Sequence, residues 1–149
     1  MRAVIQRVKE ATVRVEGKEV ARIGRGFLVL VGVEKGDGPG DLDWMAGKIA
    51  GLRLFEDEAG RMNHDLSQVG GEVLLVSNFT LCGDCRKGKR PSFDPAERPE
   101  RARELCEALV KALSQKGLSV KTGVFGAYMQ VELINDGPVT VILDSRKRL

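Results

Sequence analysis

An unbroken apolar run at residues 26–33 (Gly-Phe-Leu-Val-Leu-Val-Gly-Val) places the strongest constraint on what this chain can fold into. Alternate residues of a β-strand point to opposite faces, so a strand that is apolar at every position has to be covered on both faces. The run therefore predicts a central, fully covered strand. Residues 72–81 (Glu-Val-Leu-Leu-Val-Ser-Asn-Phe-Thr-Leu) predict a second strong strand.

Shorter strands are predicted at both ends of the chain. Residues 3–8 and 12–15 carry β-branched side chains with partial alternation, and the turn at residues 16–19 predicts a hairpin with residues 20–23. Near the C-terminus, residues 128–134 and 139–143 predict two more strands joined by the Asn-Asp-Gly-Pro turn at 135–138.

Two helices are predicted between these strands. Asp41 has the character of an N-cap, and the second helix starts near residues 95–99 and ends at Gly117. Each helix carries one apolar stripe: Leu42, Met45, Ala46, Ile49 and Leu52 in the first, and Ala102, Leu105, Cys106, Leu109 and Leu113 in the second. The prediction is a single α+β domain over residues 1–149, with a mostly antiparallel, barrel-like sheet and two main helices packed on it.

Composition excludes several classes of protein. With 42% hydrophobic residues the chain can bury a core, and no apolar run approaches the ~20 residues of a membrane span. The first residues alternate charge with apolar side chains, unlike a secretory signal, and three cysteines do not make a disulfide scaffold. A cytoplasmic protein without a membrane partner is predicted. The net charge of +3 is compatible with an anionic partner but does not demonstrate one.

The pair Cys82 and Cys85 has the CxxC spacing of a redox dithiol or of half a zinc site. The other candidate zinc ligands are Cys106, which lies in a helical apolar stripe, and His64, the only histidine. Because neither is well placed, we interpret the cysteines as incidental and expect no metal and no cofactor.

A basic segment follows the second strong strand. Arg86, Lys87, Lys89 and Arg90 put four cations in five positions. They predict either contacts to phosphate groups or a solvated loop, and spacing alone favours neither. Because no aromatic residue stands between the cations, the segment is not expected to read a base sequence.

Polar side chains end the second strong strand, at Ser77, Asn78 and Thr80. Burying such groups without partners costs about 1–3 kcal/mol each, so we expect them to face a cleft or a partner. A nucleophilic serine or threonine needs an adjacent base, and the single histidine makes a Ser-His-Asp triad improbable. Catalysis here would rely on hydrogen-bond donors, backbone amides and groups of the substrate.

Two segments carry a resemblance to a known family. Ser77-Asn78-Phe79-Thr80 resembles the Ser-Gln-Phe-Thr motif of the D-aminoacyl-tRNA deacylases, and residues 135–140 (Asn-Asp-Gly-Pro-Val-Thr) resemble their Asn-x-Gly-Pro-x-Thr motif. Similarity extends over nearly the whole chain, and includes residues 1–8, 31–37, 54–57, 87–93 and 122–129.

The resemblance implies a homodimer that hydrolyses the ester of D-aminoacyl-tRNA, and of glycyl-tRNA mischarged on tRNA-Ala, at the acceptor end. It implies that Gly137 and Pro138 form a cis peptide that reaches into the partner subunit's site and sterically excludes L-amino acids. Attack by water is expected to be assisted by the 2′-hydroxyl of the RNA. The resemblance assigns Ser77, Asn78, Phe79 and Thr80 to catalysis, with the Thr80 hydroxyl positioning the ester or the water. It assigns recognition to Asn135, Gly137, Pro138 and Thr140 and, on a third motif, to Phe125 and Met129.

Position 78 departs from the family motif, because Asn is one methylene shorter than Gln. A loosened site can cost ~100-fold in rate, so a non-catalytic tRNA-binding protein with a degenerate site is the alternative hypothesis. A zinc or thiol-redox module built on Cys82 and Cys85 is the third.

Overall fold

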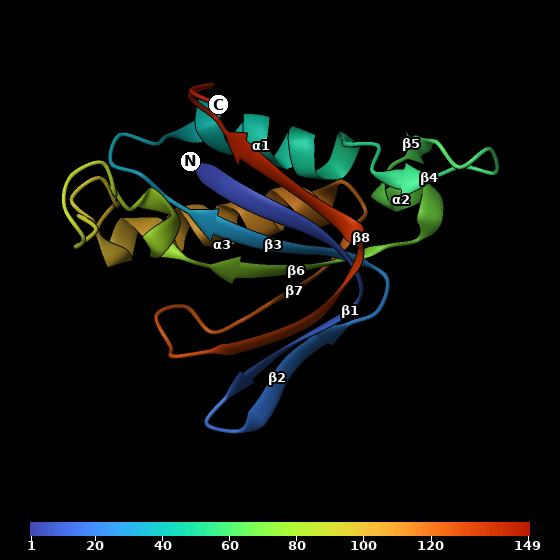
Figure 1. Cartoon of the computed structure of the whole chain (residues 1–149), viewed down its shortest axis with the longest axis horizontal. Coiled ribbons are helices and arrows are strands. Elements are labelled where there is room, and N and C mark those ends of the chain that lie inside the picture. Colours follow the sequence, from blue (N-terminus) through green and yellow to red (C-terminus); the bar gives the residue numbers. More distant parts are fainter.

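Strand β1 (Arg2–Val15) organises the sheet, because nearly every part of it pairs with a neighbour on both edges. In the computed structural model, which describes residues 1–149, one edge of β1 pairs antiparallel with β8 (Gln130–Asp144) along nearly its whole length. The other edge pairs antiparallel first with β3 (Gly26–Gly32) and then with β2 (Lys18–Ile23). The sheet bends along β1, so that its two halves have different surroundings (Figure 1).

Strand β3 is central, as its sequence predicts, and all its residues are buried except Leu30, which is half-buried. It pairs antiparallel with β1 and parallel with β6 (Glu72–Ser77), and β6 pairs parallel with β7 (Ser119–Thr122). Phe27, Val29 and Val31 belong to the large core under the helices, whereas Leu28 belongs to the core on the opposite face.

Helices α1 (Pro39–Gly51) and α3 (Pro99–Gln115) cover one face of the sheet (Figure 1). Their predicted stripes are buried there except for Leu52, which is half-buried against the same core. The prediction of Asp41 as N-cap is wrong, because Gly38 holds that position and the helix begins at Pro39, the favoured place for proline. Asp41 instead accepts a hydrogen bond from the Gly38 amide at 3.0 Å.

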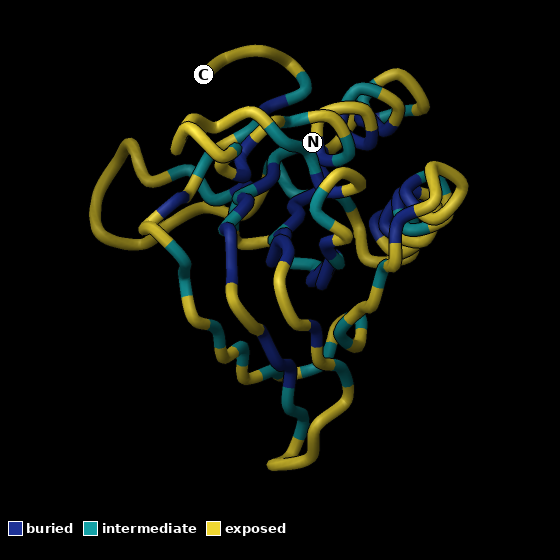
Figure 2. The backbone as a smooth tube through the Cα atoms, turned by 90° about the vertical axis from the view of Figure 1, so that its right-hand side faces the viewer, coloured by how far each residue is buried: buried dark blue, intermediate teal, exposed yellow.

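The other half of the sheet curls into a nearly closed barrel with its own small core. Seven residues form this core: Val8, Ala11, Val13, Ile23, Leu28, Leu74 and Val76. The gap between β7 and β2 is bridged by Lys121, whose Nζ donates to the carbonyl of Arg22 at 2.9 Å. Burial follows this division, with buried backbone concentrated in the strands and on the sheet-facing sides of the helices (Figure 2). The α+β, barrel-like prediction is confirmed.

Several strand boundaries differ from those predicted, three of them substantially. Residues 3–8 and 12–15 belong to one strand, β1, and residues 128–134 and 139–143 contribute to one strand, β8, because β8 stays paired with β1 on both sides of residues 136–139. The strand predicted over 72–81 ends at Ser77 and is followed by a 3-10 helix, η1 (Phe79–Cys82).

A small excursion and an extra edge strand have no counterpart among the predicted elements. Strands β4 (Phe55–Glu56) and β5 (Met62–His64) and the short helix α2 (Leu66–Val69) lie between α1 and β6, and β7 extends the sheet beyond β6. Phe55 anchors the excursion by stacking on Phe27 of β3, with ring centroids 5.1 Å apart. No helix combines the length and the apolar character that crossing a membrane would require.

Candidate active site

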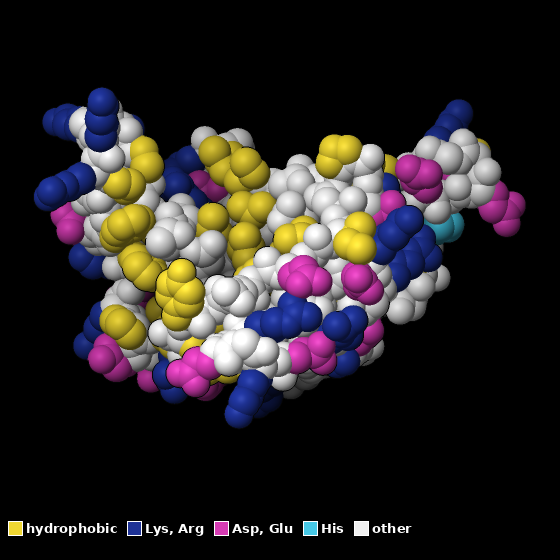
Figure 3. All heavy atoms as spheres, turned by 60° about the horizontal axis from the view of Figure 1, so that its bottom comes forward, with side chains coloured by type: hydrophobic (Ala, Val, Ile, Leu, Met, Phe, Trp, Pro, Cys, Tyr) yellow, Lys and Arg dark blue, Asp and Glu magenta, His cyan; other side chains and the backbone are white.

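A cavity of about 1070 Å³, here called the barrel cavity, opens on the sheet face that the helices do not cover. Its floor is apolar and is formed by side chains of β3, β6 and β8, namely Leu28, Leu30, Val76, Val131 and Leu133. Its rim is formed by residues 77–80, residues 96–99, residues 125–129, Lys35 and Phe93. A space-filling view shows hydrophobic side chains gathered around a hollow, with Lys and Arg on a neighbouring lobe (Figure 3). An apolar hollow with a polar rim is typical of a small-molecule or nucleotide site.

The segment Ser77–Thr80 reaches this rim because β6 stops and the chain turns into η1. The Asn78 amide donates to the Val31 carbonyl at 2.7 Å, which is the last ladder bond on this side. The Thr80 hydroxyl donates to Oδ1 of Asn78 at 2.5 Å, so the two side chains hold each other. All four predicted catalytic residues therefore line the cavity together.

Aromatic side chains stand around the same rim. Phe79 is 56% exposed and packs edge-to-face on Phe93, with ring centroids 5.3 Å apart. Phe125 lies under the Arg103 guanidinium at 5.1 Å, and Tyr128 is 91% exposed. Exposed aromatic faces beside cations are suited to stacking a nucleobase.

The structure brings Phe125 and Met129 to the cavity, as the resemblance implies, and adds residues that the sequence did not single out. The additions include Lys35, Phe93, Glu97, Arg98 and Tyr128. Phe93 lies within the stretch 87–93 that carries the family resemblance, so that stretch held a signal for it. The loops bearing Lys35 and Arg98 meet through backbone pairing of residues 34 and 96, which local sequence patterns do not reveal.

The motif containing Gly137 and Pro138 lies outside this chain's barrel cavity. It is a bulge in β8: Gln6 pairs with Thr140 and Val8 with Asn135, so residues 136–139 face Arg7 alone. The predicted turn between two strands is wrong, because β8 continues in the same direction beyond the bulge. The Gly137–Pro138 peptide is cis, and both residues are exposed.

Two side chains fix the backbone of the bulge. Oδ1 of Asn135 accepts from the Val139 amide at 2.8 Å, and its Nδ2 lies 3.1 Å from the Thr140 hydroxyl. From the neighbouring strand, Nε of Arg7 donates to the Asp136 carbonyl at 2.8 Å. Asn135 and Thr140 therefore shape the bulge and do not line this chain's own cavity.

The basic segment with Arg86, Lys87, Lys89 and Arg90 is exposed and lies next to the rim, but none of the four residues lines the cavity. Hydrogen bonds from Arg86 lower the pKa of Asp84 to about 2, so Arg86 already has a charge partner. An isolated antiparallel bridge between residues 84 and 92 joins the two ends of this segment. The rim residue Phe93 follows directly after residue 92.

The cysteines are dispersed among different environments. Cys82 is buried, and burial raises the pKa of its thiol to about 11, whereas Cys85 is exposed. Burial also raises the pKa of the Cys106 thiol. The structure holds no group of three or more His, Cys, Asp and Glu side chains suited to a metal ion. His64 lies in β5 and does not line the barrel cavity.

Comparison with known proteins assigns the family. A family model described as D-Tyr-tRNA(Tyr) deacylase matches residues 4–144. Curated relatives named D-aminoacyl-tRNA deacylase include one from Desulfitobacterium hafniense, 60% identical over 147 residues and 99% of each chain, and one from Thermotoga petrophila, 57% identical over 99% of each chain. A solved structure titled "c-Myc DNA Unwinding Element Binding Protein" is 41% identical, with a TM-score of 0.91 over 97% of this chain and 98% of the other.

A more distant solved structure shares the fold alone. It is titled as a probable eukaryotic D-amino acid tRNA deacylase, is 17% identical, and superposes with a TM-score of 0.80 over 95% of this chain and 97% of the other. With the family model covering nearly all of the sequence, this chain belongs to the D-Tyr-tRNA(Tyr) deacylase family.

Proposed function

We propose that this protein is a D-aminoacyl-tRNA deacylase, a hydrolase that cleaves the ester between a D-amino acid and the 3′-terminal ribose of a tRNA. The observation that carries the proposal is the barrel cavity, where the segment Ser77–Thr80 meets an aromatic and cationic rim. Relatives of the same name, among them one 60% identical over 99% of this chain, support it. We infer a cytoplasmic protein, because its substrate is an aminoacyl-tRNA.

The rim offers donors for the ester carbonyl. Phe79 and Thr80 open the 3-10 helix η1, and the first N–H groups of a helix have no acceptor within it. Placed at a developing oxyanion, such amides stabilise the transition state of acyl transfer. In this proposal the Thr80 hydroxyl and the Asn78 carboxamide, which are hydrogen-bonded to each other, orient the ester.

The cavity lacks an evident catalytic nucleophile with a general base beside it. No histidine lines it, and the Thr80 hydroxyl already donates to Asn78. Glu97 is the one carboxylate in the lining, and it accepts a hydrogen bond from the Arg98 amide at 2.9 Å. We therefore propose that the ribose 2′-hydroxyl, which can both donate and accept a hydrogen bond, assists the attacking water.

The rim is proposed to hold the terminal adenosine and its phosphates. In the proposal the base stacks near Phe79, Phe93 or Tyr128, and Lys35 and Arg98 contact the phosphates, because these are the cations in the lining. Arg86, Lys87, Lys89 and Arg90 are assigned to the RNA farther from the ester.

Chiral selection is assigned to Gly137 and Pro138 of a second copy in a homodimer. This chain's own Gly137 and Pro138 are exposed and stand apart from its cavity, so they are free to enter another one. A backbone element facing the α-carbon would leave no room for an L side chain, whereas glycine, which has no side chain, would be accepted. Glycyl-tRNA mischarged on tRNA-Ala is therefore a second expected substrate.

The direct test is the release of tyrosine from D-Tyr-tRNA and L-Tyr-tRNA by the purified protein. Rapid hydrolysis of the D-ester alone is expected. Equal hydrolysis of both esters, or of neither, refutes the proposal. Salt-sensitive tRNA binding without turnover would instead favour a binding protein with a degenerate site, and recovery of turnover by Asn78→Gln would identify position 78 as the cause.

A mixed dimer tests the assignment of Gly137 to the partner's site. Thr80→Ala removes the site of one subunit and leaves its loop intact, and Gly137→Ala does the reverse, because a Cβ there would lie 2.5 Å from the Val139 amide nitrogen. Thr80→Ala alone should be inactive and Gly137→Ala alone should hydrolyse the D- and L-esters equally, so neither shows an excess of D- over L-ester hydrolysis. Statistical mixing should restore about a quarter of the wild-type excess, since half the dimers then hold one complete site. No recovery in verified mixed dimers would place the loop and the site in the same subunit.

A further inference from the structure

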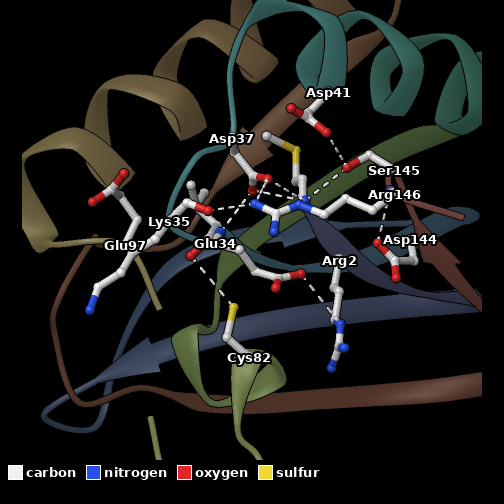
Figure 4. Close-up of polar contacts among 12 residues, drawn as sticks. Arg2, Glu34, Lys35, Asp37, Asp41, Cys82, Glu97, Asp144, Ser145 and Arg146 are labelled. Carbon is white, nitrogen blue, oxygen red and sulfur yellow. Dashed lines mark hydrogen bonds and ion pairs between the residues drawn. The ribbon is translucent and has the colours of Figure 1, made fainter. Parts of the chain in front are cut away.

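A second polar centre lies behind the barrel cavity and is built around the N-terminal amine. The Met1 ammonium is 2.8 Å from both carboxylate oxygens of Asp37 and 2.8 Å from the Ser145 hydroxyl. Met1 is completely buried, and Asp37 is 2% exposed. Figure 4 shows Asp37 and Ser145 at this centre, with Asp41 and Arg146 beside them.

The charges in this centre are matched. Asp37 also accepts from Nη2 of Arg146 at 3.0 Å, and the Ser145 hydroxyl donates to Asp41 at 2.7 Å. Two carboxylates therefore face two cations, of which the Met1 ammonium is the more deeply buried. Joining an acyl group or another residue to Met1 turns the ammonium into a neutral amide and leaves a buried carboxylate short of a cation, which is strongly destabilising.

The same centre holds one side of the cavity rim. The Glu34 amide donates to Oδ2 of Asp37 at 2.7 Å, which closes the loop formed by residues 33–37. This loop binds the segment that precedes α3 through two backbone bonds, from Lys35 N to the Pro95 carbonyl and from Glu97 N to the Val33 carbonyl, both 2.9 Å. Val33, Lys35 and Glu97 all line the barrel cavity, so the amine is connected to the rim through Asp37.

We propose that the free α-ammonium of Met1 is a structural ion of the folded protein, and that Met1 is a modification-sensitive site. An N-formyl or N-acetyl group would have to be absent for the centre to form. Removal of a formyl group is a hydrolysis: water attacks the formyl carbon, the C–N bond breaks, formate leaves and the amine takes up a proton. Because Met1 is fully buried, this step would have to occur before β1 docks into the sheet. The proposal does not depend on the function assigned to the cavity.

The test compares three forms that differ only at the N-terminus: free Met1, N-formyl-Met1, and free glycine joined to Met1. All three are made by ligation or by proteolytic cleavage, so that no tag residues remain at the N-terminus. The added glycine keeps a positive charge but moves it by about 3.5 Å. Thermal unfolding is the first readout, and hydrogen exchange of the Glu34 amide is the second, because that amide binds Asp37 directly. Neither readout requires catalytic activity.

Both altered forms should unfold at a temperature roughly 10–15 °C lower, as expected for the loss of a buried ion-pair partner in a domain of this size. Their Glu34 amide should exchange faster. The same N-terminal changes in an Asp37→Asn background should add little, since the partner of the ammonium is already neutral. A glycine added after Leu149, which is exposed, is the control for chain length and should change neither readout. An unchanged unfolding temperature and exchange rate in the formylated form would overturn the proposal, and so would equal losses in the wild-type and Asp37→Asn backgrounds.

Discussion

Replacing Arg7 by alanine should destabilise the fold and weaken selection between D- and L-esters at the same time. The Arg7 side chain is almost fully buried, with the residue only 7% exposed. Its Nε donates to the Asp136 carbonyl at 2.8 Å, directly before Gly137, and its Nη1 donates to the Leu54 carbonyl at 2.7 Å. The variant therefore loses the tie between β1 and the bulge and leaves two carbonyls without their donor.

The magnitude follows from these two bonds. A hydrogen bond from a charged group contributes about 1.5–3 kcal/mol, so the loss amounts to about 3–6 kcal/mol. A domain of this size loses roughly 3 °C in Tm per kcal/mol, which gives roughly 10–20 °C. In the deacylation assay, the ratio of D- to L-Tyr-tRNA hydrolysis should fall because the bulge is no longer held. Arg7→Lys keeps the charge but cannot reach both carbonyls in the same way, so its Tm and its D-to-L ratio should lie between those of the wild type and of Arg7→Ala. It replaces the alanine variant in the assay if that variant does not fold.

Arg14→Ala is the matched control, because Arg14 also joins β1 to β8. Its ion pair with Glu132, at 2.6 Å, is partly exposed, and exposed pairs contribute about 0–1 kcal/mol. Selectivity should be unchanged. If Arg7→Ala is no less stable than Arg14→Ala, or keeps the full D-to-L ratio, then Arg7 does not position the bulge.

Three further predictions concern the cavity and the C-terminal ion pairs. Glu97→Gln should lower the rate of deacylation by less than about tenfold, which is short of the ~10²–10⁴-fold that a general base contributes. A substrate ending in 2′-deoxyadenosine should be hydrolysed barely above background. A large loss in Glu97→Gln together with rapid hydrolysis of the deoxy substrate would instead make Glu97 the base. Asn78→Ala should lower kcat/KM for the D-ester by about 10²-fold through lost positioning, with Tm nearly unchanged; full activity would show that the carboxamide does not contribute. Burial raises the pKa of Asp144 and Glu34, but hydrogen bonds from Arg148 outweigh it, so that the pKa of Asp144 falls to about 2 and that of Glu34 is also lowered. The resulting stability is present above about pH 4 and is lost as the pH falls toward 2, so Arg148→Ala should flatten the dependence of Tm on pH in this window; an unchanged slope would contradict the pairing.

The sequence predicts those parts of the fold that depend on local pattern. The apolar run of β3 requires two covered faces, and both α1 and α3 carry stripes that match their buried sides. Strand β7 has only four residues and owes its existence to pairing with β6, so no local pattern marks it. The segment 135–138 has the composition of a turn, yet its pairing with β1 keeps it within β8.

The site residues likewise divide into those that the local sequence marks and those that it does not. Ser77–Thr80 is conspicuous because polar residues end an apolar strand, and they do reach the cavity. The cations in the lining are Lys35 and Arg98, each isolated in the sequence, while the conspicuous cluster at 86–90 lies outside it. These two cations reach the cavity because the loops that bear them pack against each other. The local sequence around each residue does not indicate that contact.

The position of β1 in the sheet also sets an order of events during synthesis. One of its edges can pair with β2 and β3 as soon as those strands exist, but the other waits for β8, with Arg2 pairing Asp144 and Ala3 pairing Leu143. Between Gly32, the last residue of β3, and Asp144, the last residue of β8, the ribosome adds 112 residues, which at about 5–20 residues per second takes roughly 6–22 s. Throughout it, β1 presents an unpaired edge of the kind that recruits other strands. The strand that organises the native sheet is therefore open to mispairing on the ribosome, and a chaperone that shields open β edges would protect this chain by binding β1 during that interval.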